Sequence, residues 1–275
     1  EFRRVLCRSA LSSDGNRGQL IRLEGLSKTF ERDRVQVDAV AGIDLTVSRG
    51  EIVAVIGPSG CGKSTLLHMI AGLYQPSAGR VIYAGAPVSG VNTAVAYMTQ
   101  KDTLLPWRTV RDNVAMPLEI AGIARPDRQA RADQDLARLG LAGFETRYPS
   151  ELSGGMRKRA ALARMLLQGA ESLLLDEPFG ALDAQLKLVM QDLLLRLTAE
   201  EGQTVVFVTH DLVEAVTLAD RVVVCSRRPA RIILEQVIDL PRPRDVNAVR
   251  FESRFKWLYE AIWNSLRSEY VEETS

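Results

Sequence analysis

Residues 57–64 read Gly-Pro-Ser-Gly-Cys-Gly-Lys-Ser, which fits the phosphate-binding pattern G-x-x-x-x-G-K-[ST]. The apolar, β-branched run 51–56 before it predicts a buried strand, and the run 65–71 after it predicts a helix that ends at Gly72. A strand, a glycine loop and a helix in this order place backbone N–H groups and a helix N-terminus around a phosphate. A plain glycine turn is the alternative, and the flanking runs count against it. The pattern therefore predicts a nucleoside triphosphate site.

Individual residues of this phosphate loop have expected roles. Lys63 is expected to reach the β and γ phosphates, and the Ser64 hydroxyl to hold Mg²⁺. Cys61 lies at a predicted helix N-terminus beside Lys63, a position expected to lower the pKa of its thiol and raise its reactivity. The alternative, given equal weight, is that Cys61 is simply a small residue that fits the loop. The residues expected to bind the nucleoside triphosphate here, which is ATP under the family resemblance described below, are Gly57, Pro58, Ser59, Gly60, Cys61, Gly62, Lys63, Ser64 and Thr65.

Bulk composition excludes several classes of protein. The 275 residues carry a net charge of +1, so no overall field attracts nucleic acid. No apolar run approaches the length of a transmembrane helix, which predicts a soluble chain or one that meets a membrane only through a partner. The three cysteines are widely spaced and form no C-x-x-C pair, which argues against a disulfide framework or a zinc site and fits a reducing cytosol.

Strand-like and helix-like runs alternate along the chain, which predicts an α/β fold with a parallel sheet covered on both faces. Residues 101–170 interrupt this alternation as a helical insert, in which Thr109 with Asp112 marks a helix start. The runs predicted as strands are 20–56 (with breaks near 32–34 and 48–50), 80–83, 93–98, 172–175 and 204–208; helices are predicted over 128–140 and 184–199.

Two adjacent carboxylates, Asp176 and Glu177, end the apolar run 173–175. Side chains of neighbouring residues on a strand diverge, so the two can have different tasks. Asp176 is expected to position Mg²⁺, and Glu177 to polarise the attacking water as general base. Simple solvated caps of a buried strand are the alternative, which the nearby phosphate loop disfavours.

The chain has two histidines. His68 lies among apolar residues of the helix after the phosphate loop and is expected to pack or to face solvent. His210 follows the apolar run 204–209 and precedes Asp211 at a predicted helix start. A polar residue at the end of a parallel strand faces the ligand crevice, so His210 could contact a γ-phosphate or the attacking water. On this evidence alone a helix-capping neighbour without chemistry is the favoured interpretation.

The run 151–159, Glu-Leu-Ser-Gly-Gly-Met-Arg-Lys-Arg, resembles the signature segment of ATP-binding cassette (ABC) proteins. Ser153, Gly154 and Gly155 would open a helix and offer a second anion-receptive N-terminus. The resemblance implies that two chains bind head to tail, each signature contacting the ATP of the partner chain. Pairing with a second copy is expected, with a related second subunit as the alternative.

Other motifs extend this resemblance over residues 20–240 in the expected order. The resemblance implies that Gln100 senses Mg²⁺ and the attacking water, that Asp183 lies in a loop at the dimer interface, and that His210 is the switch histidine. Phe30 stands where an aromatic side chain usually stacks on adenine, although family members often carry Tyr there.

The resemblance implies a P-loop NTPase core, a mostly parallel sheet flanked by helices, with an N-terminal antiparallel β part and a helical insert that carries the signature. The expected organisation is a flexible segment at 1–18, an ATPase domain at 19–240 with its helical part at about 101–170, and a linker with an amphipathic helix at 241–275.

Leu104, Leu105 and Trp107, which follow Gln100, together with the Pro-Arg repeats of 241–244, resemble ATPase subunits of bacterial nitrate, sulfonate and taurine importers. The Pro-Arg repeats are equally typical of a plain extended linker. This resemblance implies that Leu104, Leu105 and Trp107 dock on membrane permease subunits, with core residues of the insert as the alternative. It also implies a peripheral location on the cytoplasmic face of the bacterial inner membrane, and an external solute-binding protein that delivers a small anion.

Rival interpretations are a non-transport ABC ATPase that acts on ribosomes or DNA, and a small-molecule kinase. The first usually carries two cassettes or a long insert before the signature, and nucleic acid binding needs clustered Lys and Arg. A kinase has no reason to carry the signature. No nucleic acid partner is therefore expected.

At the C-terminal end, apolar residues recur at helical steps, which predicts an amphipathic helix. The favoured interpretation is a helix that folds back on its own domain, and the alternative is contact with a partner subunit or an anionic membrane. The residues of this predicted stripe are Phe251, Phe255, Leu258, Ile262 and Leu266.

Overall fold

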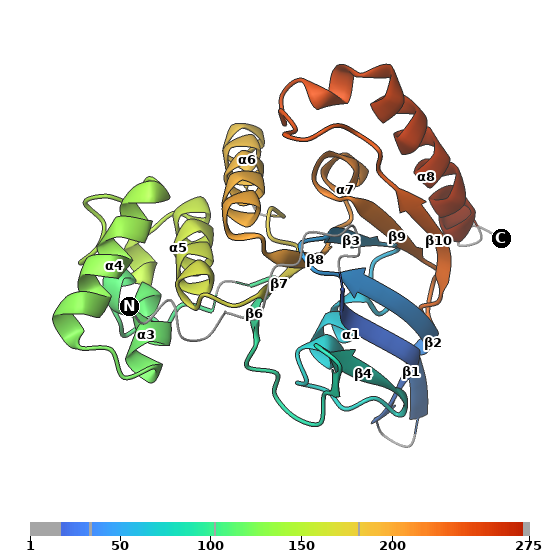
Figure 1. Ribbon diagram of the computed structural model, residues 1–275, viewed down its shortest axis with the longest axis horizontal. Helices are drawn as coiled ribbons and strands as arrows, with labels where there is room; N and C mark the ends of the chain where they lie inside the picture. Colours follow the sequence, from blue (N-terminus) through green and yellow to red (C-terminus); the bar gives the residue numbers. More distant parts are fainter. Residues whose placement is uncertain (1–17, 33–34, 102, 181, 272–275) are drawn as a thin grey trace.

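Two β-sheets and a helical insert make up the fold in the computed structural model, which describes residues 18–32, 35–101, 103–180 and 182–271 (Figure 1). The predicted flexible segment lies outside these residues except for Gly18, and so does Cys7. The first sheet is antiparallel, as predicted for the N-terminal part, with the strand order β2-β1-β4-β5. Its strands are β1 (Gln19–Arg32), β2 (Val35–Ser48), β4 (Ala78–Tyr83) and β5 (Ala86–Pro87).

The second sheet has six strands in the order β10-β9-β3-β8-β7-β6. All neighbours are parallel except β10, which pairs antiparallel with β9. The runs predicted as strands near 51–56, 93–98, 172–175 and 204–208 all lie in it, whereas β9 and β10 were not predicted. The strands are β3 (Ile52–Ile56), β6 (Val95–Met98), β7 (Ser172–Asp176), β8 (Thr204–Val208), β9 (Arg221–Cys225) and β10 (Ile232–Val237).

Helices cover both faces of the six-stranded sheet, because the sheet strands are apolar on both sides. On one face, α1 (Lys63–Ile70) packs between this sheet and the antiparallel sheet (Figure 1). On the other face lie α6 (Ala184–Glu201), α7 (Leu212–Leu218) and α8 (Ser253–Val271), which share a second apolar core. Because strands β3, β6, β7, β8 and β9 are parallel, their carboxyl ends lie at the same edge of the sheet. The loop before α1 and the predicted catalytic loops begin at this edge.

The helical insert lies at one end of the molecule, where α5 packs against the edge strand β6 (Figure 1). The side chain of Thr109 accepts a hydrogen bond from the Asp112 N–H, as expected of a helix start. Its elements are α2 (Val110–Val114), α3 (Met116–Ile120), α4 (Arg125–Arg138), the 3₁₀ turn η2 (Pro149–Glu151) and α5 (Gly154–Leu167).

The C-terminal helix α8 folds back on the chain, against α7, β9 and β10. Phe255, Leu258, Ile262 and Leu266 of the predicted stripe are buried, in agreement with the favoured interpretation. The prediction was wrong for Phe251, which is 84% exposed, because it belongs to the separate 3₁₀ turn η3 (Val249–Phe251) that precedes the helix. None of the helices in the described part of the chain is long and apolar enough to cross a lipid bilayer.

Candidate active site

The phosphate loop joins β3 to α1, as predicted from its glycine spacing. The buried Lys63 ammonium donates hydrogen bonds to the carbonyls of Gly57 (2.8 Å) and Pro58 (2.7 Å), so it lies across the mouth of its own loop. Gly62 has a φ of +129°, and a Cβ on it would lie 2.4 Å from the Ala39 carbonyl oxygen. Only glycine fits this position, because both the backbone angle and the contact exclude a side chain.

Ser64 and Asp176, which lie 112 positions apart in the sequence, meet at the start of α1 and the end of β7. The Ser64 hydroxyl donates a hydrogen bond to Oδ1 of Asp176 (3.1 Å), and the Tyr97 hydroxyl lies 3.5 Å from Oδ2. Burial raises the pKa of Asp176, an effect that the Ser64 hydrogen bond partly offsets. Tyr97 on β6 was not predicted; the apolar alternation of that strand gives no signal that its hydroxyl meets Asp176.

Glu177 lies between two groups that the sequence predicted to be near it. The side-chain amide of Gln100 donates to its Oε2 (3.0 Å), and Nδ1 of His210 lies 3.4 Å from its Oε1. Glu177 has a φ of +47°, a left-handed conformation that is strained for a residue with a side chain. Such strain is concentrated at functional sites, where the surrounding structure holds it.

The signature segment begins α5, as expected. The Ser153 side chain accepts a hydrogen bond from the Met156 N–H at the helix N-terminus. Gly155 packs so closely on α6 that a Cβ would lie 2.5 Å from a methyl group of Leu186. Asp183 caps α6 in the same way, accepting from the Leu186 N–H (2.9 Å). The signature helix and the Asp183 loop are therefore packed against each other within one chain.

Phe30, the predicted adenine contact, lies on β1 beside the phosphate loop's helix. Its ring makes an edge-on contact with Tyr74, the two centroids lying 5.5 Å apart, and the Lys28 ammonium lies 5.2 Å from its centroid. His68 contacts Tyr74 on one side and Tyr97 on the other, so it packs as expected.

Cys61 is only 1% exposed. Its sulfur lies 3.7 Å from Nζ of Lys63, which agrees with the predicted electropositive neighbour. Reagents reach thiols only from solvent, so its burial favours the alternative that a small residue fits the loop. Cys225 packs beside it, and burial raises the pKa of the Cys225 thiol to about 12.

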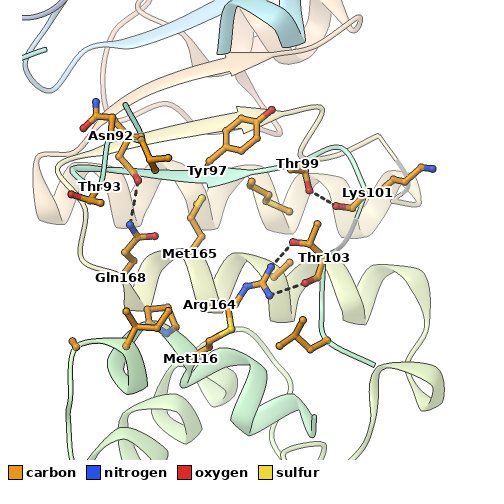
Figure 2. Close-up of a pocket in the computed structure, with 18 residues that line it drawn as sticks. Asn92, Thr93, Tyr97, Thr99, Lys101, Thr103, Met116, Arg164, Met165 and Gln168 are labelled. Atoms are coloured by element: carbon orange, nitrogen blue, oxygen red, sulfur yellow. Dashed lines mark hydrogen bonds between the residues drawn. The ribbon is translucent and has the colours of Figure 1, made fainter. Parts of the chain in front are cut away.

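The three predicted docking residues have different environments. Leu104 is 7% exposed and belongs to the apolar core of the insert, so that part of the docking prediction is wrong and the core alternative holds. Trp107 is 71% exposed. Leu105 lines a cavity of about 630 Å³ between β6, α3 and α5 (Figure 2).

Buried Asn113 fixes the loop that carries Leu105 and Trp107. Its side chain accepts from the Leu105 N–H (2.6 Å) and donates to the Leu105, Arg108 and Thr109 carbonyls (3.0–3.1 Å). Fixing one side chain to four backbone groups leaves the loop little freedom. These hydrogen bonds fix the backbone on both sides of Trp107 and so keep its side chain exposed.

Basic residues of α5 hold the segment after Gln100. The Lys158 ammonium donates to the Gln100 carbonyl (2.5 Å), and the Arg164 guanidinium donates to the Thr103 carbonyl (2.9 Å) and hydroxyl (2.6 Å), as Figure 2 shows for Arg164. The sequence analysis missed these contacts, and the only signal was that Lys158 and Arg164 are basic residues of the helix that the signature was expected to open.

A second unpredicted cluster lies behind His210. The Lys187 ammonium of α6 lies 2.6 Å from Asp211 and 2.6 Å from the buried Glu214, which accepts a further hydrogen bond from Thr209. The cluster ties the start of α6, near Asp183, to the loop that carries His210. It is a position-fixing network, since every charge in it has a partner.

The comparisons with known proteins agree with this geometry. The family described as ABC transporter matches residues 40–180. The chain is 46% identical to an uncharacterized ABC transporter ATP-binding protein of Methanocaldococcus jannaschii (91% of this chain, 92% of that protein). It is 49% identical to the aliphatic sulfonates import ATP-binding protein SsuB 1 of Xanthomonas axonopodis pv. citri (75% and 82%). It is 40% identical to the taurine import ATP-binding protein TauB of Burkholderia thailandensis (90% and 96%).

Among solved structures, the fold is similar to that of a dimeric ATP-binding cassette in a post-hydrolysis state bound to ADP and Pi. The TM-score is 0.74 at 29% identity, over 81% of this chain and 100% of that one. The α/β fold predicted from the sequence is thereby confirmed. With its phosphate loop, its paired carboxylates and its signature helix, this chain belongs to the ABC transporter ATP-binding proteins and is an ATPase.

Proposed function

We propose that this chain is the ATP-hydrolysing subunit of a bacterial importer for a small anionic solute of the sulfonate, taurine or nitrate class. Relatives whose names describe sulfonate and taurine import support the solute class. In this proposal two copies bind ATP, close, and act on membrane permease subunits, while an external binding protein delivers the solute. The location is then peripheral, on the cytoplasmic face of the inner membrane.

The cavity between β6, α3 and α5 is the observation that carries the coupling part of the proposal. It is open to solvent and lined by apolar side chains that include Leu105, Met116 and Ile120 (Figure 2). A short apolar helix of a permease subunit fits such a groove. The groove wall continues directly into Gln100, so an occupant would press on the residue that contacts Glu177.

The contacts made by α5 support transmission from the groove to the ATP site. Lys158 and Arg164 fix the segment 100–103 to the same helix that Ser153 opens. A displacement at the groove would therefore move Gln100 and the signature together, since the Gln100 backbone is hydrogen-bonded to α5 and the signature is the N-terminal end of that helix.

The hydrolytic step that we propose uses Glu177 as general base. Its carboxylate would accept the proton of a water positioned in line with the γ-phosphate, while Gln100 and His210 hold its two oxygens. The Lys63 ammonium would leave the loop carbonyls for the β and γ phosphates, whose charge it matches better.

Mg²⁺ fits the residues at the start of α1. Ser64 and Asp176 offer hard oxygen donors that already lie 3.1 Å apart, and Mg²⁺ is typically held by one or two carboxylates plus substrate phosphates. Within the described residues no group of three His, Cys, Asp or Glu side chains is suited to a metal, so the phosphates would complete the shell. Bound Mg²⁺ would supply charge neutralisation at the phosphates, and Gln100 would be a further residue that senses it.

In a head-to-tail pair of chains, Ser153, Gly154 and Gly155 of one chain would contact the ATP that is bound to the other chain. The N-terminus of α5 offers backbone N–H groups and the positive end of a helix dipole. Asp183 would lie at the interface of that pair, beside the signature of its own chain.

Co-purification with the permease subunits tests the proposal. We expect a Leu105→Ala/Trp107→Ala variant to hydrolyse ATP within about threefold of the unchanged chain but to lose assembly and transport. Val237→Ala is the control, since it truncates another exposed apolar side chain, on β10. A double variant that melts normally and still assembles and transports would rule out docking at this groove.

A further inference from the structure

The end of β9 and the turn between β9 and β10 pack against the phosphate loop at its three glycines. A Cβ on Gly57 would lie 2.8 Å from the Cys225 carbonyl oxygen, and one on Gly62 would lie 3.3 Å from Cβ of Ala230. Between these contacts, the Arg228 guanidinium donates from Nη2 (2.8 Å) and Nε (3.2 Å) to the Gly60 carbonyl. The phosphate loop is therefore backed along its length by a segment more than 160 positions away.

The Arg228 contact fixes the orientation of one peptide plane in the phosphate loop. In a trans peptide the carbonyl of Gly60 and the N–H of Cys61 point in opposite directions. With the carbonyl held outward by Arg228, the Cys61 N–H points across the loop to the Pro58 carbonyl (3.3 Å). Phosphate loops bind anions through backbone N–H groups, and a bound phosphate would replace the Pro58 carbonyl as the acceptor of this N–H, so the orientation of the plane bears on nucleotide affinity.

The turn that carries Arg228 is itself ordered. The Ser226 hydroxyl lies 2.9 Å from the Arg227 carbonyl and 3.2 Å from that of Pro229, and it accepts from the Arg231 N–H (3.0 Å). The Ala230 N–H donates a hydrogen bond to the Ala39 carbonyl of β2, and the Ala230 carbonyl accepts one from the Ala41 N–H, both at 3.0 Å. Arg228 therefore reaches the phosphate loop from a rigid base.

Glu269, near the end of α8, attaches this turn to the C-terminal helix. Its Oε2 accepts a hydrogen bond from the Arg227 N–H (2.8 Å) and lies 3.8 Å from Nε of Arg227. The Glu269 side chain is mostly buried, so water screens this contact less than it would an exposed pair. The C-terminal helix thus reaches the phosphate loop through two adjacent residues.

We propose that Arg228 is a positioning residue of the ATP site and that Glu269 holds it in place, which makes the C-terminal helix a support of nucleotide binding. A loop that is already ordered loses less freedom when ATP binds. Arg228 acts on the loop in the ground state and the transition state alike, so its loss raises KM and leaves kcat nearly unchanged. The inference rests on residues 57–64 holding the phosphates, and it does not depend on the permease.

Steady-state ATPase kinetics of the full chain with MgATP, together with titration of a fluorescent ATP analogue, test this. We expect Arg228→Ala to raise KM and Kd about fivefold with kcat within about twofold, and Arg228→Lys to recover part of the loss. Glu269→Gln is expected to raise KM about twofold. Arg231→Ala is the matched control, because it removes the same charge from the same hairpin, while the bonds to Gly60 come from Arg228.

Equal effects of Arg228→Ala and Arg231→Ala would show that the loss of a positive charge, and not of the hydrogen bonds to Gly60, changes KM, and would overturn the proposal. A fall in kcat at unchanged KM would also overturn it, and an unchanged KM in Glu269→Gln would overturn the role of α8. Lys63→Ala separates this outcome from failure of the premise. If Lys63→Ala binds the analogue normally, the phosphate-loop assignment itself is wrong.

Discussion

The side-chain amide of Gln100 lies 3.0 Å from Oε2 of Glu177, although the two residues stand 77 positions apart. His210 approaches the other carboxylate oxygen at 3.4 Å. The carboxylate is therefore held from both sides by loops that end different strands, β6 and β8. Because Glu177 has a strained backbone, these contacts help to keep it in place.

Removal of the Gln100 amide is expected to lower kcat about tenfold with little change in KM, since the base loses one of its two holding groups. Gln100→Ala is compared with Gln129→Ala, which truncates the same side chain on α4. Steady-state ATPase assays give both constants. A Gln100→Ala variant with unchanged kcat would separate this residue from catalysis.

His68 makes the stability of the chain depend on pH. Burial of its imidazole lowers the pKa of His68 below 6.5, an effect that nearby Asp176 partly offsets. The unfolded chain therefore binds this proton at a higher pH than the folded chain does, so the free energy of unfolding falls as the pH drops through 6.5 toward the lower folded pKa. The contribution of the neutral His68 ring to the free energy of unfolding is fully present above about pH 6.5 and is lost progressively below it.

His68→Phe keeps a ring between Tyr74 and Tyr97 but cannot titrate. We expect its free energy of unfolding, measured by urea titration, to fall less between about pH 7.5 and about pH 5.5 than that of the unchanged chain. Equal slopes over this window would show that His68 does not change its pKa on folding.

The buried stripe of α8 is expected to stabilise the chain. Ile262 is 0% exposed, so Ile262→Ala should lower the free energy of unfolding by about 2–4 kcal/mol through lost burial and a cavity. Trp263→Ala, one position along on the partly exposed side, should cost less than that although it removes a larger side chain. Urea titration of both variants decides; a larger loss for Trp263→Ala would mean that the packing face of α8 is assigned wrongly.

Neither Cys61 nor Cys225 should react with iodoacetamide in the native chain, because both thiols are buried. Labelling should follow only on unfolding, which peptide mapping by mass spectrometry can measure. Fast native labelling of Cys61 that MgATP prevents would instead restore the prediction of a reactive thiol.

The parts of the site that the sequence predicted depend on local patterns. The phosphate loop, the carboxylates Asp176 and Glu177, and the start of α5 each follow or precede an element whose periodicity is readable. Gln100 and His210 follow β6 and β8, the two strands that flank β7, so their meeting at Glu177 just after β7 follows from topology once the sheet is parallel.

What the sequence could not predict depends on contacts between distant segments. Nothing local distinguishes Leu104, which packs into the insert, from Trp107 three positions later, which does not. The same holds for Arg228, whose partner Gly60 lies 168 positions away and becomes a neighbour only because β9 pairs with β3. Phe251 fits the helical spacing of the C-terminal stripe, but the helix begins only at Ser253.

Turnover of Glu177→Gln with ATP and Mg²⁺, measured beside the mass of the chain in solution, is the most direct test of catalysis at this site. The change keeps the shape of the side chain and one acceptor oxygen but removes the carboxylate that serves as base. We expect ATP binding to be retained, hydrolysis to slow by about a hundredfold or more, and ATP to hold two chains together as a stable dimer. Near-normal turnover, or a chain that stays monomeric with bound ATP, would contradict the assignment of Glu177 and of the closed pair.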